Sequence, residues 1–325
     1  MIVAALDVGT NTVRLLVARL GPGGRLDPLR YALRITRLGG GATPAGLAED
    51  AIERTVAAVA DFAREAREAG AVALRAVATS AAREAPNGRR VVARVREAAG
   101  LDLEIIPGEE EAALALRGIR WSLERLPGGV PDRFAIVDLG GGSTEVLLAE
   151  RRGDAWHAEG PSIPIGTVRL VERFLAADPP ATHEMVAMAA AVEAALAASL
   201  DPVLARAGEA GRSRPLVGTA GAITTFAAMD LGLATYDRAR IDGHRMSRAS
   251  LEARLDQVAA MPAARRLELP GLEPGREDLI VPGLVILLAV MGRLRANAVT
   301  VVDGGLLEGI CLTSFDPPAD AGPGR

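Results

Sequence analysis

Short runs rich in valine, leucine and isoleucine alternate along the chain with longer segments in which apolar residues recur every three or four positions. Runs of the first kind are typical of buried strands, and segments of the second kind are typical of amphipathic helices. Strands are predicted over 2–6, 13–20, 29–38, 72–78, 103–106, 133–138, 144–150, 215–218 and 299–302. Helices are predicted over 49–68, 90–99, 109–123, 183–207, 248–261, 277–295 and 304–311. Because strands and helices alternate, we expect an α/β protein.

One segment of the chain is repeated, and the repeat carries the candidate chemistry. Residues 7–18 overlay on residues 138–149, and each copy has an aspartate at the end of an apolar strand, a turn of small residues and a second apolar strand. Backbone N–H groups of such a turn can converge on an anion, with hydroxyl groups as further donors. The aspartate can hold a hydrated Mg²⁺ against a bound phosphate. A single turn of this kind is typical of an ordinary β-turn, whereas two copies favour phosphate binding.

Six motifs in a fixed order resemble one protein family. They are Asp7–Arg14, Ala78–Ala85, Gly108–Ala112, Asp138–Glu145, Gly218–Gly221 and Val281–Leu284. Their order along the chain is similar to that of the exopolyphosphatase/guanosine pentaphosphate phosphatase (Ppx/GppA) family within the actin-like superfamily. The resemblance implies two actin-like (ribonuclease H-like) α/β domains with an interdomain cleft. It places domain I at residues 1–125 plus 305–325 and domain II at 126–304, with the Pro- and Gly-rich segment 126–131 as the linker.

The same resemblance assigns roles to individual residues. Glu111 matches the general base for an attacking water. The metal-binding residues that it implies are Asp7, Asp138 and Glu145, with Mg²⁺ or another divalent cation as the cofactor. The residues that it implies for substrate phosphate are Thr10, Asn11, Thr12, Arg14, Arg83, Gly140, Gly141, Gly142, Ser143, Gly218 and Gly221.

Several of these assignments have alternatives. Arg14 contacts phosphate or pairs with an acid of the other domain. Arg83 contacts phosphate, pairs with Glu84 or Glu110, or is a solvated helix residue. The segment 218–221 holds a nucleotide base or is only a tight turn. Glu109–Glu111 also suit a helix N-terminus through the helix dipole alone.

The sequence departs from the family pattern at two positions. Pro107 stands where the family has serine, and Leu307 stands where an arginine before Glu308 is common. We expect the additional helical domains of longer family members to be absent.

The amino-acid composition excludes several classes of function. The 325 residues contain no lysine, so all 37 basic side chains are arginine. This excludes a Walker A loop, a protein-kinase-type active site and a Schiff-base enzyme, since each needs a lysine amine. The formal net charge of −4 argues against a generic nucleic-acid binder.

The cysteine count and the longest apolar run indicate where in the cell the protein resides. Cys311 is the single cysteine, so no internal disulfide or cysteine-based zinc site can form, and we expect a cytoplasmic protein. The run at 279–292 is short for a membrane span and contains Pro282, which indicates a buried helix and no membrane contact.

We therefore expect a hydrolase that releases terminal orthophosphate from inorganic polyphosphate, converts guanosine pentaphosphate to tetraphosphate, or does both. The resemblance also implies a homodimer. The alternatives are a small-molecule kinase of the same superfamily and a non-catalytic sensor of alarmone or polyphosphate.

Overall fold

The computed structural model describes residues 1–208 and 213–315, and the contacts within it divide the chain into two compact units. Unit 1 comprises Met1–Trp121 and the segment that begins at Gly304, and unit 2 comprises Ser122–Asp303. The last part of the expected domain I, residues 316–325, lies outside the described residues.

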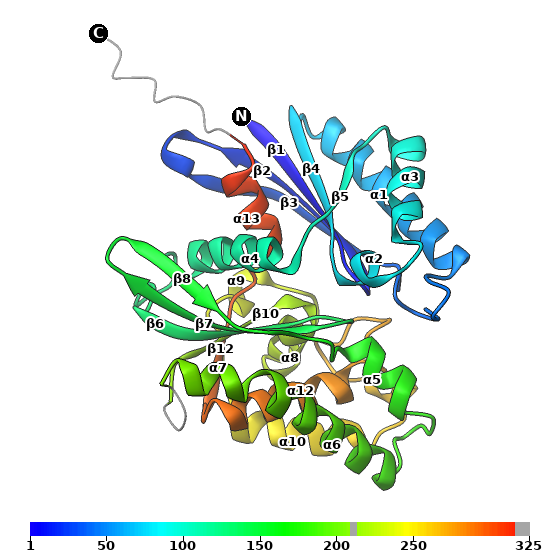
Figure 1. Ribbon diagram of the computed structural model, residues 1–325, viewed down its shortest axis with the longest axis vertical. Helices are drawn as coiled ribbons and strands as arrows, with labels where there is room; N and C mark the ends of the chain where they lie inside the picture. The colour runs from blue at the N-terminus through cyan, green and yellow to red at the C-terminus, as the bar shows by residue number, and fades with distance from the viewer. Residues whose placement is uncertain (209–212, 316–325) are drawn as a thin grey trace. The chain divides into compact units, whose positions relative to one another are not determined.

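Unit 1 is built on a five-stranded sheet with helices on both faces (Figure 1). In spatial order, the strands are β3 (Leu26–Ile35), β2 (Thr12–Leu20), β1 (Ile2–Val8), β4 (Ala73–Ala78) and β5 (Leu103–Ile105). β1, β2 and β3 form an antiparallel meander, while β4 and β5 run parallel to β1. The carboxyl ends of β1, β4 and β5 therefore meet at one edge of the sheet.

Two apolar clusters cover the two faces of this sheet. On one face, Ile52 and Phe62 of α1 (Glu49–Glu68) and Val91 of α3 (Gly88–Ala99) pack against alternate residues of β1 and β2. On the other face, α4 (Gly108–Leu123) and α13 (Leu306–Thr313) contribute buried residues that include Leu307 and Cys311. Burial raises the pKa of the Cys311 thiol, so this cysteine stays protonated and is no nucleophile.

Unit 2 is built on a larger mixed sheet (Figure 1). Its strands, in spatial order, are β11 (Arg245–Ser247), β12 (Ala298–Val301), β10 (Leu216–Thr219), β6 (Arg133–Leu139), β7 (Thr144–Arg152) and β8 (Ala155–Glu159), and β9 (Ser162–Ile163) also pairs with β7. The helices are α5 (Thr167–Phe174), α6 (Thr182–Ser199), α7 (Asp201–Arg206), α8 (Ala220–Asp230), α9 (Arg238–Ile241), α10 (Arg248–Ala259), α11 (Ala263–Arg266) and α12 (Ile280–Arg293). β6, β10 and β12 are mutually parallel, so their carboxyl ends also share one edge.

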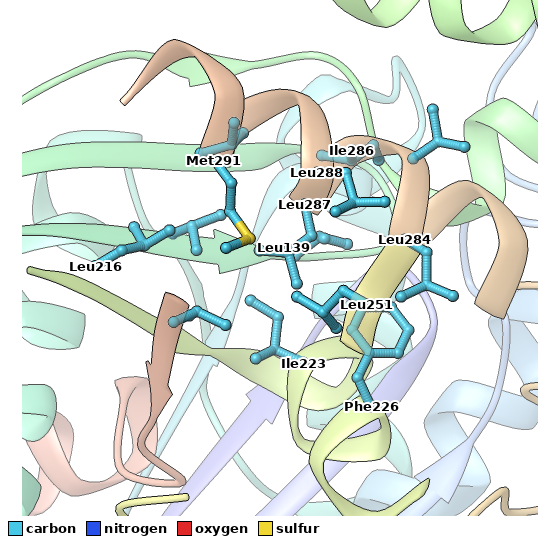
Figure 2. Packing of buried hydrophobic residues seen from close by; sticks show 14 of the residues in the cluster. Leu139, Leu216, Ile223, Phe226, Leu251, Leu284, Ile286, Leu287, Leu288 and Met291 are labelled. Carbon is cyan, nitrogen blue, oxygen red and sulfur yellow. The ribbon is translucent and has the colours of Figure 1, made fainter. Parts of the chain in front are cut away.

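The core of unit 2 forms around α12, whose residues from Ile280 to Leu288 are all buried. Figure 2 shows Leu284 and Met291 of this helix with Phe226 of α8 and Leu216 of β10 in one apolar cluster. The expectation that the run at 279–292 is a buried helix is confirmed, because apolar side chains surround the helix on all sides from Ile280 to Leu288.

The described part of the chain also has one helical segment, Thr182–Arg206, that is long and apolar enough to cross a membrane, with 28% of its most apolar window buried. It spans α6 and α7, which the pattern predicts as one helix over 183–207. The helix breaks at Leu200 because Pro202 has no N–H and takes an early position in a new helix. Met188, Val192 and Leu196 face the core of unit 2, as the helical spacing predicts.

The packing of α13 depends on a glycine. A Cβ at Gly309 would lie 1.9 Å from the carbonyl oxygen of Leu114 in α4, so no side chain fits there. We predict that Gly309→Ala destabilises unit 1 by about 1–3 kcal/mol or more through overpacking. Gly292, on the exposed side of α12, has only the end of Arg248 near a Cβ at 3.5 Å. Gly292→Ala should be neutral or stabilise by up to about 1 kcal/mol, since alanine is the better helix former.

Thermal unfolding of both variants tests this prediction. Equal melting temperatures for Gly309→Ala and the unchanged protein would contradict the tight approach of α4 and α13.

Candidate active site

The two hairpins of the sequence repeat have the same main-chain geometry. In hairpin 1 (β1–β2), the N–H of Gly9 donates to the carbonyl oxygen of Thr12 at 2.9 Å. In hairpin 2 (β6–β7), the N–H of Gly140 donates to the carbonyl oxygen of Ser143 at 3.0 Å. The same bond at equivalent positions makes the two turns structural repeats as well as sequence repeats.

In hairpin 1 the strand-end acid faces a cation. Asp7 lies opposite Arg14 in the β1–β2 register, and Arg14 Nη2 and Nε donate to Asp7 Oδ2 at 2.6 and 2.9 Å. The Asp7 side chain is 4% exposed. Arg14 thus pairs with an acid of its own unit, a partner that the sequence alone did not suggest.

Two oxygens of hairpin 1 remain available to a ligand. In the part of the chain that the structure describes, the buried atoms Asp7 Oδ1 and Asn11 Oδ1 have no hydrogen-bond partner. Both are acceptors, and a buried acceptor without a donor is costly. They therefore fit a ligand that brings donors, such as a hydrated cation.

The neighbouring strand β4 brings more polar groups to the same edge. It leads into α2 (Ser80–Glu84), and the buried hydroxyl of Ser80 lies 2.9 Å from the hydroxyl of Thr10 in hairpin 1. The N–H of Thr79 donates to the carbonyl oxygen of Val8, which ties the β4–α2 junction to hairpin 1. Two hydroxyl groups are thus held together beside the turn.

Glu111 and Arg83 form an ion pair at this edge. Arg83 Nη1 donates to Glu111 Oε2 at 2.8 Å and to the carbonyl oxygen of Ile106 at 3.0 Å. Glu111 lies in the first turn of α4, and its N–H donates to the carbonyl oxygen of Pro107. Arg83 therefore forms its ion pair with Glu111, and not with Glu84 or Glu110 as expected. Glu110 instead pairs with Arg75 at 2.7 Å.

In hairpin 2 the strand-end acid faces another acid. Asp138 lies opposite Glu145 in the β6–β7 register, at the positions that Asp7 and Arg14 hold in hairpin 1. Glu145 is buried, and its Oε1 accepts hydrogen bonds from the hydroxyls of Ser143 at 2.8 Å and Ser162 at 2.5 Å. Like charges directly opposite each other are destabilising, so this pair favours a bound cation.

The turn of hairpin 2 is oriented by α5. The carbonyl oxygens of Gly140 and Gly141 accept from the N–H groups of Thr167 and Val168 at 3.1 and 3.0 Å. A Cβ at Gly166 would lie 2.4 Å from the carbonyl of Gly141, so glycine is required for this approach. Because a trans peptide points its C=O and N–H in opposite directions, the N–H groups of the turn point away from α5. These N–H groups can therefore donate to an anion.

The segment 218–221 joins β10 to α8 at the same edge of unit 2. Gly218 is buried, and a Cβ there would lie 2.8 Å from Val299 and 2.9 Å from Ile223, so this glycine serves close packing. Ala220 has φ of 74°, in the left-handed region. A Cβ at Gly221 would lie 2.6 Å from Nη1 of Arg276. Glycine at position 221 therefore leaves room for the Arg276 side chain against this turn.

Arg276 is a candidate that the sequence reasoning missed. It is 7% exposed and forms an ion pair with the half-exposed Glu273 at 3.2 Å. Arg266, equally buried, donates instead to the main-chain carbonyls of Val258 and Glu277, which is a structural use of the guanidinium. Only the proximity of Arg276 to the motif at 281–284 was available as a signal in the sequence.

The two departures from the family pattern have structural consequences of different kinds. Pro107 supplies a carbonyl to the first turn of α4, a role that any residue can fill. Leu307 is part of the apolar core under α13, so its side chain packs where an arginine is common. The adjacent Glu308 is buried and accepts from the Tyr31 hydroxyl at 2.7 Å and from the N–H of Gly305 at 2.7 Å.

The carboxylates of hairpin 2 are ligands that fit a divalent cation. Mg²⁺ keeps several waters and is held by one or two carboxylates, so the facing acids Asp138 and Glu145 suffice. Within the described residues, no three His, Cys, Asp or Glu side chains group closely enough to form a protein-only metal cage. Within the described residues, Asp7 Oδ1 of hairpin 1 is a separate acceptor without a hydrogen-bond partner.

The family model described as the Ppx/GppA phosphatase family matches residues 16–316. The chain belongs to the Ppx/GppA phosphatase family. Exopolyphosphatase 2 of Mycobacterium tuberculosis is 36% identical over 324 residues, which cover 96% of this chain and 98% of that protein. A guanosine-5'-triphosphate,3'-diphosphate pyrophosphatase of Vibrio cholerae is 30% identical over 94% of this chain and 58% of that protein.

A solved structure from the Ppx/GppA family agrees with the fold. The crystal structure of the Aquifex aeolicus member is 30% identical, has a TM-score of 0.74 and covers 97% of both chains. The expected family and the α/β class with two actin-like domains are confirmed.

The two hairpins should respond in opposite ways to the same substitution. We predict that Asp7→Asn lowers the melting temperature of the metal-free protein, because it removes the ion pair with Arg14. Asp138→Asn should leave that temperature unchanged or raise it, because it removes one of two facing negative charges. Thermal unfolding in EDTA measures both variants, and a larger loss for Asp138→Asn would refute the contrast.

Proposed function

We propose that this chain hydrolyses the terminal phosphoanhydride bond of inorganic polyphosphate or guanosine pentaphosphate and releases orthophosphate. The observation that carries the proposal is the pair of equivalent hairpins, each with a strand-end acid and a turn of small residues. The names of the family relatives support a hydrolase that acts on acid anhydrides. They favour this activity over the kinase and sensor alternatives.

Each hairpin contributes binding and charge neutralisation by itself. The N–H groups of the hairpin 2 turn and the hydroxyl pair of Thr10 and Ser80 can donate to phosphate oxygens. Arg276 adds a cation to the 218–221 turn. Phosphoryl transfer needs little covalent chemistry from a protein, so positioning and electrostatic stabilisation carry most of the catalysis.

Glu111 is the proposed general base. A water oxygen forms a bond to the terminal phosphorus while the bridging P–O bond breaks, and the shortened chain leaves as a phosphate anion. The water loses a proton to the Glu111 carboxylate, which Arg83 holds in place by its 2.8 Å bond. Arg83 thereby acts as a positioning residue for Glu111, in addition to the phosphate contact expected from the sequence.

Magnesium is the proposed cofactor, with Asp138 and Glu145 as its ligands in hairpin 2. Asp7, also expected to bind metal, offers an acceptor oxygen in hairpin 1. When bound, such an ion neutralises charge on the phosphoryl oxygens. A cytoplasmic location and a homodimer, both expected from the sequence, stand as proposals as well.

We predict that Glu111→Gln lowers kcat by about 10²–10⁴ with little change in phosphate affinity, because the amide cannot accept the proton. Glu110→Gln is the matched control, since Glu110 is half-exposed and pairs with Arg75 outside this ion pair. Orthophosphate release from tripolyphosphate and guanosine pentaphosphate, without any acceptor, measures both variants. Near-normal turnover in Glu111→Gln would remove this residue from the mechanism.

A second prediction concerns metal dependence. Asp138→Asn and Glu145→Gln should each raise the Mg²⁺ concentration that gives half-maximal activity, because each removes a charged oxygen ligand. A Mg²⁺ titration of phosphate release compares them with Glu110→Gln. An unchanged midpoint in both hairpin variants would mean that these acids serve another purpose.

A further inference from the structure

β3 is an edge strand with exposed apolar side chains. In the part of the chain that the structure describes, β3 pairs with β2 alone, and its outer edge pairs with no strand. Leu29 and Leu33 of β3 are 43% and 41% exposed. Exposed apolar edge strands are the strands to which another chain can add a strand of its own. The outer edge of β3 is therefore a candidate interaction surface.

The hydrogen bonds beside hairpin 1 determine which main-chain groups of β3 point outward. The N–H of Thr36 donates to the carbonyl oxygen of Asn11, the residue before β2, so Thr36 bonds inward. In an antiparallel pair, residues that bond inward alternate with residues whose N–H and C=O groups point away from the partner strand. Ile35 and Leu33 precede Thr36 by one and three positions, so their N–H and C=O groups point outward. These groups can bond to a further strand.

The two faces of β3 differ in character. Arg34 Nη1 donates to Asp61 of α1 at 2.7 Å, and Arg30 pairs with Glu65 of the same helix. Both guanidinium groups are thus held on the α1 face and have acidic partners there. Because successive side chains of a strand alternate between the two faces, Leu33 lies on the opposite face of the sheet. β3 therefore presents compensated charges on one face and an exposed apolar side chain on the other.

One register suits the pairing of β3 with β3 of a second copy. An antiparallel pair centred on Leu33 places Leu33 opposite itself. On the α1 face, Arg34 then lies opposite Ala32, and Arg30 lies opposite Thr36. No arginine faces another arginine directly, and the outward main-chain groups of the two copies face each other.

The neighbouring registers are less favourable. A pair centred on Ala32 would place Arg30 opposite Arg34, and like charges directly opposite each other are destabilising. A pair centred on Tyr31 would extend to the residues of β3 that lie opposite the irregularity between Val17 and Ala18 of β2. The alternation of outward main-chain groups is interrupted there. Charge and strand geometry therefore select the register centred on Leu33.

We propose that β3 is the contact surface of a homodimer, in which two copies pair antiparallel about a two-fold axis at Leu33. This inference rests on the homodimer of the proposed function and assigns a surface to it. The contact gives hydrogen-bond partners to the outward main-chain groups of Leu33 and Ile35, and it removes the Leu33 side chain from water. A two-fold contact uses the same surface on both copies, so β3 is sufficient for it.

Disulfide cross-linking tests the register. Opposite Cα atoms of a hydrogen-bonded antiparallel pair lie about 5.5 Å apart, within the usual range for a disulfide. Leu33→Cys should therefore cross-link two copies when diamide oxidises the two thiols. Leu29→Cys is the matched control, because its two copies would lie about 27 Å apart in this register. The native Cys311 is buried, so the new thiol is the reactive one. Non-reducing gel electrophoresis measures the cross-linked fraction of each variant.

Light scattering tests the contact without a cross-link. The unchanged protein should have twice the mass of one chain. Leu33→Glu should shift the mass to that of one chain, because it places two carboxylates opposite each other at the axis. Leu267→Glu is the control, since Leu267 is equally exposed at 41% but lies outside β3, and this variant should keep the dimer mass. Circular dichroism should show both variants folded.

The outcomes separate the surface from the homodimer itself. If Leu33→Glu keeps the dimer mass, or if Leu29→Cys cross-links as much as Leu33→Cys, the β3 contact is overturned while the homodimer stands. If the unchanged protein has the mass of one chain, both fail. The phosphate-release assays test the hydrolase independently of these measurements.

Discussion

Both candidate phosphate turns depend on one main-chain hydrogen bond, from the glycine after the strand to the residue three positions on. It joins Gly9 to Thr12 in hairpin 1 and Gly140 to Ser143 in hairpin 2. This bond sets the strand register, and the register decides which residue faces the strand-end acid. A slip by one residue would turn that acid to the other face of the sheet, away from the turn.

The same backbone carries two different charge arrangements. In hairpin 1 the acid and its partner attract each other, so Asp7 and Arg14 stabilise the hairpin without a ligand. In hairpin 2 the facing residues Asp138 and Glu145 repel each other, and a cation between their oxygens would relieve the repulsion. Under the proposed function, hairpin 1 therefore keeps an internal ion pair without a ligand, whereas in hairpin 2 a cation would lower the repulsion between the facing acids.

The sequence predicted most of the fold because apolar periodicity is strong in the buried strands and helices. Among the elements that it missed, β8 is mostly exposed, and β9 and α5 have only two and eight residues. The motifs placed both hairpins, but the partner of Arg83 depends on where α4 begins relative to α2, and that is a matter of tertiary packing. The chain also folds back from β3 onto hairpin 1, where the N–H groups of Thr36 and Arg37 donate to the carbonyl oxygen of Asn11, and no local pattern encodes this contact.

In a chain without lysine, the residue type says little about which cations serve a site. The arginines differ in the groups that accept hydrogen bonds from their guanidinium N–H donors. Arg266 donates hydrogen bonds to main-chain carbonyls and so stabilises a loop. Arg14 donates hydrogen bonds to the buried carboxylate of Asp7 and so neutralises the charge of that acid in hairpin 1. Arg276 instead lies against the 218–221 turn, where glycine at position 221 leaves room for its guanidinium. Because a buried guanidinium is costly unless its charge is compensated, an anion at this turn would add to the compensation that Glu273 already gives Arg276.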